Sequence, residues 1–153
     1  MNSYLCGNNM KKGREIKMSD VLYTSKATAV GGREGHVKSS DSNIDIDLVK
    51  PGTSGGTNPE QLFAAGYSSC FDGALNLIAS KEKKEIDSEI TAAVSLVKDQ
   101  SDDGFKIAVE LKAVIGGVSQ SEAEDLVEKA HEFCPYSKAT RGNIDVKLSV
   151  ETK

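Results

Sequence analysis

The sequence lacks several features that would place it in a particular class of protein. It has no tryptophan, no apolar run near the roughly 18 residues of a membrane span, and no apolar N-terminal segment of the kind found in signal peptides. We therefore expect a cytoplasmic protein without a membrane partner. The three cysteines, Cys6, Cys70 and Cys134, form no CxxC pair, which excludes zinc ribbons and thioredoxin-type motifs. In a reducing compartment such thiols serve packing or chemistry.

An excess of positive charge is also missing. The formal net charge is -4 over 153 residues, which gives no reason to expect nucleic acid as a partner. Neither GxGxxG nor GxxxxGK[ST] is present, so the common nucleotide-binding loops are excluded. Hydrophobic residues make up 38% and charged residues 27%, as in ordinary globular domains. The expected partners are small molecules or other proteins.

The N-terminal segment differs in composition from the rest. Residues 1–17 are polar and have no sustained hydrophobic period, so we expect a disordered extension. Met18 opens the patterned part and is a candidate for the biological start of translation. Residues 18–153 are long enough for a single domain that buries roughly two thirds of its unfolded surface.

The first half of this domain predicts short strands followed by a helical region. Alternating apolar residues predict three strands, at 22–30, 35–39 and 44–48. Asn58 followed by Pro59 is typical of a helix start, because asparagine caps the first turn and proline suits its first position. The helical region then extends to about Ser80.

The second half predicts a hairpin, a helix and a last strand. Residues 91–98 and 105–115 alternate in polarity and are joined by the turn-forming sequence SDDG. Ser119 and Glu122 form a capping box for a helix that reaches about Phe133. Residues 144–150 alternate again. The predicted order is βββ-α-ββ-α-β, an α+β domain with antiparallel sheets around a central helical region.

Two cysteines stand in settings that allow chemistry. Cys70 lies in the apolar sequence NPEQLFAAGYSSCF, where a buried packing role and a reactive thiol both fit. Cys134 lies in CPYS at a predicted helix end, with the same two alternatives. His131 precedes Cys134 by three residues, on the same helical face. A metal site with both cysteines would lack a second clear pair of ligands, so we expect no metal.

Two charged residues are uninformative by themselves. Arg33 lies in the glycine-flanked turn GGREG, where a solvated arginine is common. Glu60 falls in the first turn of a predicted helix, where the dipole favours an acid in any protein.

Three blocks of sequence together resemble the Ohr/OsmC family, and the Ohr branch in particular. The blocks are LYTSKATAVGGREG (22–35), TNPEQLFAAGYSSCF (57–71) and CPYSKATRGNIDV (134–146), in the family's order. The resemblance implies an OsmC-like fold and an intertwined homodimer with active sites at the subunit interface. It also implies reduction of organic hydroperoxides to alcohols, with no bound cofactor and with dihydrolipoamide or a lipoylated protein as electron donor.

The same resemblance assigns roles to individual residues. Cys70 matches the peroxidatic cysteine and Cys134 the resolving cysteine, while Arg33 and Glu60 match the pair that activates the thiol. An ordinary cysteine is only a few per cent thiolate at neutral pH, so a permanent positive charge at Arg33 suits the reaction. Glu60 would hold the guanidinium in a bidentate ion pair. The sequence does not decide whether a further set of apolar residues forms substrate walls or ordinary core, namely Leu62, Phe63, Phe71, Phe133 and Tyr136.

These roles lead to a prediction about the helix. Glu60 and Cys70 are ten residues apart, which is about 15 Å along a straight helix. If one arginine is to contact both, the helix should break between Gly66 and Ser69, with Cys70 in the first turn of a new helix.

Three functions remain open from the sequence. The first is the peroxidase that the resemblance implies. The second is a thiol redox sensor or binding protein that uses Cys70 and Cys134 as a switch without turnover. The third is a structural protein with inert thiols.

Overall fold

The structure, a computed structural model, describes residues 17–153, and the predicted α+β class and element order are confirmed, with one short helix added. The strands are β1 (Ala27–Val30), β2 (His36–Ser39), β3 (Asp45–Asp47), β4 (Asp87–Lys98), β5 (Phe105–Gly116) and β6 (Val146–Thr152). The helices are α1 (Pro59–Lys81), α2 (Gln120–Phe133) and the added α3 (Pro135–Thr140). Cys6 and nearly all of the predicted N-terminal extension lie outside the described residues.

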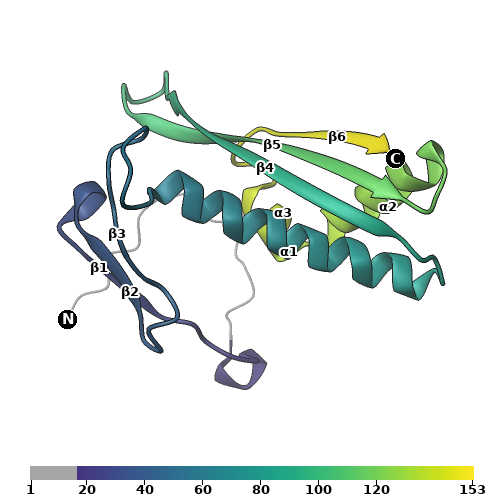
Figure 1. Cartoon of the computed structure of the whole chain (residues 1–153), viewed down its shortest axis with the longest axis horizontal. Coiled ribbons are helices and arrows are strands. Elements are labelled where there is room, and N and C mark those ends of the chain that lie inside the picture. The colour runs from purple at the N-terminus through teal and green to yellow at the C-terminus, as the bar shows by residue number, and fades with distance from the viewer. Residues whose placement is uncertain (1–16) are drawn as a thin grey trace.

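The larger sheet has the order β4-β5-β6 and lies over the helices (Figure 1). The predicted hairpin of β4 and β5 is confirmed, and the two strands pair in antiparallel fashion. The expectation of antiparallel sheets was wrong for β6, which pairs parallel with β5. The physical reason is the connection, because the chain leaves β5, passes through α2 and α3 and re-enters the sheet in the same direction.

The core lies between this sheet and the helices. From Val109 to Ile115 every second residue of β5 is buried on the face toward the helices, whereas Glu110 and Lys112 between them are exposed. Helix α1 contributes Tyr67, Phe71 and Leu75 to the same core. These three residues recur at positions i, i+4 and i+8, so they form one stripe along the helix. No helix within residues 17–153 combines the length and apolarity needed to cross a membrane.

The predicted break near Gly66–Ser69 was wrong, because α1 is one continuous helix. Ser69 donates its hydroxyl to the carbonyl of Ala65, so the serine is satisfied inside the helix rather than at a cap. Gly66 serves close packing, since a Cβ there would lie 2.5 Å from the hydroxyl oxygen of Tyr136. Burial of an unbroken apolar stripe outweighs the poor helix propensity of these residues.

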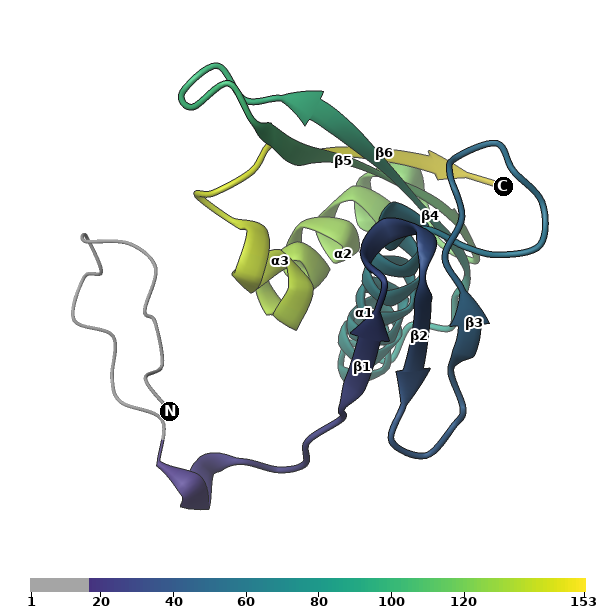
Figure 2. The same ribbon diagram turned by 90° about the vertical axis from the view of Figure 1, so that its left-hand side faces the viewer.

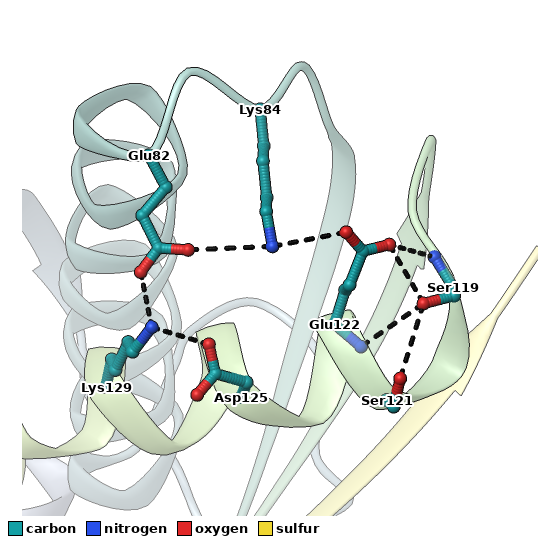
Figure 3. A network of polar contacts seen from close by, with 7 residues as sticks. All are labelled: Glu82, Lys84, Ser119, Ser121, Glu122, Asp125 and Lys129. Carbon is teal, nitrogen blue, oxygen red and sulfur yellow. Dashed lines mark hydrogen bonds and ion pairs between the residues drawn. The ribbon is translucent and has the colours of Figure 1, made fainter.

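A network of charged residues fastens the end of α1 to α2 (Figure 3). Lys129 of α2 contacts Glu82, which follows α1, and also Asp125 one turn earlier in α2. Lys84 lies between Glu82 and Glu122, at 3.6 and 3.3 Å. Glu122 also closes the predicted capping box with Ser119, which is confirmed. The network therefore fixes α2, and with it the residues that follow α2, relative to α1.

The smaller sheet, β1-β2-β3, is antiparallel throughout and stands beside the N-terminal part of α1, away from the core (Figure 2). No residue of its three strands is buried within the chain, and Val30 and Ile46 are 71% and 38% exposed. Leu48, just after β3, is buried and forms a bridge to Thr57. That bridge holds the start of α1 close to the end of β3.

Candidate active site

The structure brings together the two cysteines that the sequence singled out. The Sγ atoms of Cys70 and Cys134 are 3.7 Å apart, although the residues are 64 positions apart in the chain. Cys70 lies in the middle of α1 and is half-buried, whereas Cys134 is fully buried at the joint between α2 and α3. A disulfide is about 2.05 Å long, so the sulfurs need to approach by only about 1.7 Å to form one.

The surroundings of Cys70 do not activate it within one chain. Burial raises the pKa of the Cys70 thiol, and the neighbouring Cys134 raises it further, while a hydrogen bond from the backbone N–H of Tyr136 acts in the opposite direction. The predicted place in a first helical turn was wrong, because eleven helical residues precede Cys70 in α1. Its position therefore offers no unpaired N–H groups of a helix start to stabilise a thiolate.

Arg33 is presented by a tight glycine turn. The residues Gly32–Glu34 form a single 3-10 turn between β1 and β2, and Gly31 before it has a positive φ of 81° that favours glycine. A Cβ at Gly35 would lie 1.8 Å from the carbonyl oxygen of Val30. The backbone of this turn therefore favours the glycines of GGREG. The turn directs Arg33 toward the start of α1, where Glu60 lies.

Arg33 and Glu60 form the predicted pair, but through a single contact. The Nη2 atom of Arg33 lies 2.6 Å from Oε2 of Glu60, and no second contact joins the two groups, so the bidentate geometry expected from the sequence is absent from this part of the described chain. The guanidinium holds the pKa of the Glu60 carboxyl below its usual value. The carboxylate is mostly buried, whereas about half of the Arg33 side chain is exposed.

The two pairs do not meet within one chain. Ten residues of continuous helix, about 15 Å of rise, separate Glu60 from Cys70. Among residues 17–153, no hydrogen bond joins Arg33 to either cysteine. Within one chain, the Cys70–Cys134 pair and the Arg33–Glu60 pair are therefore two separate groups.

The four aromatic residues considered as substrate walls are divided between three places. Phe63 and Tyr136 line a mainly apolar hollow of about 400 Å³, and their rings are 5.8 Å apart in an edge-to-face arrangement. Phe71 is fully buried in the core. Phe133 is 41% exposed at the end of α2, where the ammonium groups of two lysines lie over its ring.

A second hollow, of about 410 Å³, adjoins the Arg33–Glu60 pair. Its apolar walls come from α1, β4 and the loop before α1 and include Ala64, Val94 and Pro51, while Asn58 and Gln61 add polar groups. The hollow therefore offers polar and apolar contacts together.

A chain of buried polar side chains near the cysteines was not anticipated. The Ser137 hydroxyl is 2.9 Å from Nδ1 of His131 and 3.0 Å from the hydroxyl of Tyr67, which in turn is 3.2 Å from that of Thr140. His131, considered above as a metal ligand, is thus occupied by a serine. Little in the sequence indicated these contacts, because Ser137 and Thr140 lie in a short segment (135–140) without a hydrophobic period.

Comparison with known proteins agrees with this geometry. Residues 52–149 match the family model described as OsmC-like protein. The chain is 55% identical to the organic hydroperoxide resistance proteins OhrB and OhrA of Bacillus subtilis, with 85% and 87% of this chain and 98% and 99% of those proteins covered.

Solved structures give the same result. The crystal structure of OhrB from Bacillus subtilis matches with a TM-score of 0.83, over 86% of this chain and all of that one. An organic hydroperoxide resistance protein from Elizabethkingia anophelis, crystallised with thiocyanate bound, is 49% identical and matches with a TM-score of 0.78, over 87% of this chain and 99% of that one. The chain belongs to the Ohr/OsmC family.

Proposed function

We propose that the protein is a thiol peroxidase that reduces organic hydroperoxides to alcohols. The Cys70 thiolate attacks the outer peroxide oxygen, the O–O bond breaks, and the alcohol leaves with a proton while Cys70 becomes a sulfenic acid. The Cys134 thiol then displaces the hydroxyl as water and forms a Cys70–Cys134 disulfide. A dithiol such as dihydrolipoamide, free or on a lipoylated protein, reduces that disulfide by exchange. A cytoplasmic location would suit this cycle.

The observation that supports the proposal most is the sulfur–sulfur distance. Two thiols 3.7 Å apart, one half-buried and one fully buried, suit a reaction in which the first is oxidised and the second condenses with it. The names of the family relatives point to the same substrates. Burial of Cys134 also suits a resolving thiol, because a buried thiol is protected from direct oxidation by peroxide.

We further propose that the active site is completed between two copies of the chain in an intertwined homodimer. The Cys70 thiol has a raised pKa in a single chain, so it needs a cation to form a thiolate. Arg33 has five N–H donors, of which its contact with Glu60 uses one, so the others remain for a sulfur or a peroxide oxygen. The small sheet, with Val30 and Ile46 exposed, suits burial against a partner.

The hydrocarbon part of the substrate has a candidate site in the hollow of Phe63 and Tyr136. Tyr136 connects this hollow to the thiol, because its backbone N–H donates to the Cys70 sulfur. An alkyl or aryl group in the hollow would bury apolar surface, a gain of about 25 cal/mol per Å² that hydrogen peroxide cannot make. Organic hydroperoxides should therefore be preferred.

Turnover assays test the catalytic cycle. With dihydrolipoamide, we expect the protein to turn over cumene, tert-butyl and fatty-acid hydroperoxides faster than hydrogen peroxide. Cys70→Ser should abolish turnover, and Cys134→Ser should allow one oxidation that proceeds to sulfinic acid. Mass spectrometry of the oxidised wild type should show a Cys70–Cys134 disulfide. A bond to Cys6 instead would refute the assignment of roles.

Mixed dimers test whether the site is shared. Chains carrying Cys70→Ser keep Arg33, and chains carrying Arg33→Met keep Cys70. Each variant alone should be inactive or nearly so. If Arg33 acts on the partner's thiol, mixing the two by refolding should restore one working site in each mixed dimer. Restored activity is the expected result, and its absence in a verified mixed dimer would refute a shared site.

A redox sensor without turnover is the second candidate. The observation that favours it is the distance of 3.7 Å between the Cys70 and Cys134 sulfurs, because a reversible disulfide switch needs the same pair of thiols. A sensor would consume one equivalent of hydroperoxide and form the disulfide, but dihydrolipoamide would not sustain further consumption. The assay above separates the two functions.

A further inference from the structure

We propose that the buried polar chain of His131, Ser137, Tyr67 and Thr140 positions the Cys134 thiol for its reaction with oxidised Cys70. The inference rests on the proposed peroxidase function and concerns its second step. These four residues are positioning residues, because none of them forms a hydrogen bond to either sulfur among residues 17–153.

Counting protons from the bond that Thr140 donates to a carbonyl gives one consistent direction for each hydrogen bond. Thr140 donates its one hydroxyl proton to the carbonyl oxygen of Ser137, at 3.2 Å. Its oxygen must therefore accept from Tyr67, whose own oxygen then accepts from Ser137. With its proton used, the Ser137 hydroxyl accepts from Nδ1 of His131. Every bond of the chain runs one way, so each strengthens the next.

Three of these hydrogen-bonded residues lie close to the two cysteines in the amino-acid sequence. Tyr67 lies three positions before Cys70 in α1, and His131 and Ser137 lie three positions before and after Cys134. Cys134 is both the last cap of α2 and the first cap of α3, with an extended ψ of 127°. The bond between His131 and Ser137 therefore spans the joint that carries the resolving thiol.

Tyr67 connects this joint to the helix of the other thiol. Its hydroxyl joins α1 to α3, while its ring packs at 6.1 Å from Phe63 and 5.6 Å from Tyr136. All three hydroxyl-bearing residues of the chain are buried, so a broken bond would leave a polar group without water. The hydrogen bonds from His131 in α2 to Ser137 in α3 and from Ser137 to Tyr67 in α1 thus hold Cys134 close to Cys70.

In the affected step, Cys134–SH reacts with Cys70–SOH to give the disulfide and water. The sulfurs must close a gap of about 1.7 Å, and a displacement of about 1 Å in a reacting group can slow a reaction by about 100-fold. Loosening the joint should therefore slow disulfide formation. It should change the first step much less, because Cys70 keeps its own position on the uninterrupted helix α1.

The experiment follows the two steps separately in single turnover. Protein without reductant is mixed with one equivalent of cumene hydroperoxide and quenched over time with dimedone, which traps sulfenic acid. Mass spectrometry then quantifies thiol, trapped sulfenic acid, disulfide and sulfinic acid. The variants are Tyr67→Phe, which keeps the ring and loses one oxygen, and Ser137→Ala. Ser88→Ala is the matched control.

Ser88 is a suitable control because it also removes a partly buried hydroxyl that bonds to α1. Its Oγ donates to Asp72 at 2.6 Å, and Asp72 lies two residues after Cys70. The control therefore perturbs α1 near the first thiol without touching the joint of Cys134. Urea denaturation of all the variants identifies any that do not fold, and Tyr67→Phe carries the test if Ser137→Ala is one of them.

We expect loss of the Cys70 thiol at a rate within twofold of wild type in every variant. Disulfide formation should slow by about tenfold or more in Tyr67→Phe and Ser137→Ala, with more trapped sulfenic acid and sulfinic acid, and stay unchanged in Ser88→Ala. Disulfide formation within twofold of wild type in both joint variants would overturn the proposal, and so would equal slowing in Ser88→Ala. Failure of the peroxidase function is seen separately, as a wild-type Cys70 that reacts no faster than free cysteine.

Discussion

Gly66→Ala tests the packing that places Tyr136 beside the thiol. A glycine inside a helix costs about 1 kcal/mol relative to alanine, so at an open position the substitution would stabilise α1. Here the new Cβ would lie 2.5 Å from the hydroxyl oxygen and 3.0 Å from Cζ of Tyr136. Phe63 and Tyr67 pack against the ring, so it can move away only toward the hollow that it lines and at the expense of these contacts.

The magnitude follows from these opposing effects. Overpacking that displaces a packed side chain costs about 1–3 kcal/mol, which cancels or exceeds the gain in helix propensity. The free energy of unfolding should therefore fall by zero to about 2 kcal/mol, instead of rising by about 1 kcal/mol. Tyr136→Phe removes the atom closest to the new Cβ, and in that background Gly66→Ala should cost about 1–2 kcal/mol less.

Urea denaturation of the wild type, the two single variants and the double variant measures this coupling. All four proteins are compared at one concentration, because the stability of an oligomer depends on concentration. Movement of Tyr136 should also change the rate at which iodoacetamide alkylates Cys70, because the Tyr136 N–H donates to that sulfur. Effects that add within about 0.5 kcal/mol would show that Gly66 and Tyr136 are not in contact, and the reasoning would fail.

The remaining predictions concern charge. NMR titration should give two histidine pKa values on opposite sides of 6.5, because Asp47 and Asp45 raise that of His36 whereas burial lowers that of His131. Protonated His36 stabilises the folded state below pH 6.5, and this stabilisation is lost as the pH rises through the pKa of His36 in the folded protein. Asp47→Asn should therefore lower the His36 pKa and weaken the pH dependence of the unfolding free energy. For Glu60 the sign is reversed, since Arg33 lowers its pKa and the stabilisation is lost as the pH falls. Between about pH 5 and 3, the wild type should therefore lose more unfolding free energy than Arg33→Gln does; equal losses would contradict this.

Local signals in the sequence located most element ends. Asn58 accepts from the backbone N–H of Gln61, and Ser119 shares a full capping box with Glu122, as their spacing predicted. These features are short-range, because each is decided within one helical turn. The β4–β5 hairpin was predicted for the same reason, although β4 begins at Asp87, earlier than its apolar alternation indicated.

Features decided by distant contacts were not predicted. Gly66 and the serines after it favour a break by propensity, but the ring of Tyr136 and the core under α1 make the helix continuous. Helix α3 is too short to show a period, and the parallel direction of β6 depends on the path through it. The residues of the two candidate pairs were identified by resemblance, whereas the distance between the pairs required the fold.

The small sheet β1-β2-β3 has a consequence for how the protein exchanges its amide hydrogens. None of its strand residues is fully buried within the chain, so its backbone hydrogen bonds open without exposing a core. If two copies pair as proposed, protection in these strands should rise with protein concentration, while protection in β5 between Val109 and Ile115, where alternate residues are buried within the single chain, should stay constant. In such a dimer the position of Arg33, which the small sheet carries, would depend on the subunit contact, so dilution would loosen this cation before it loosens the thiol pair.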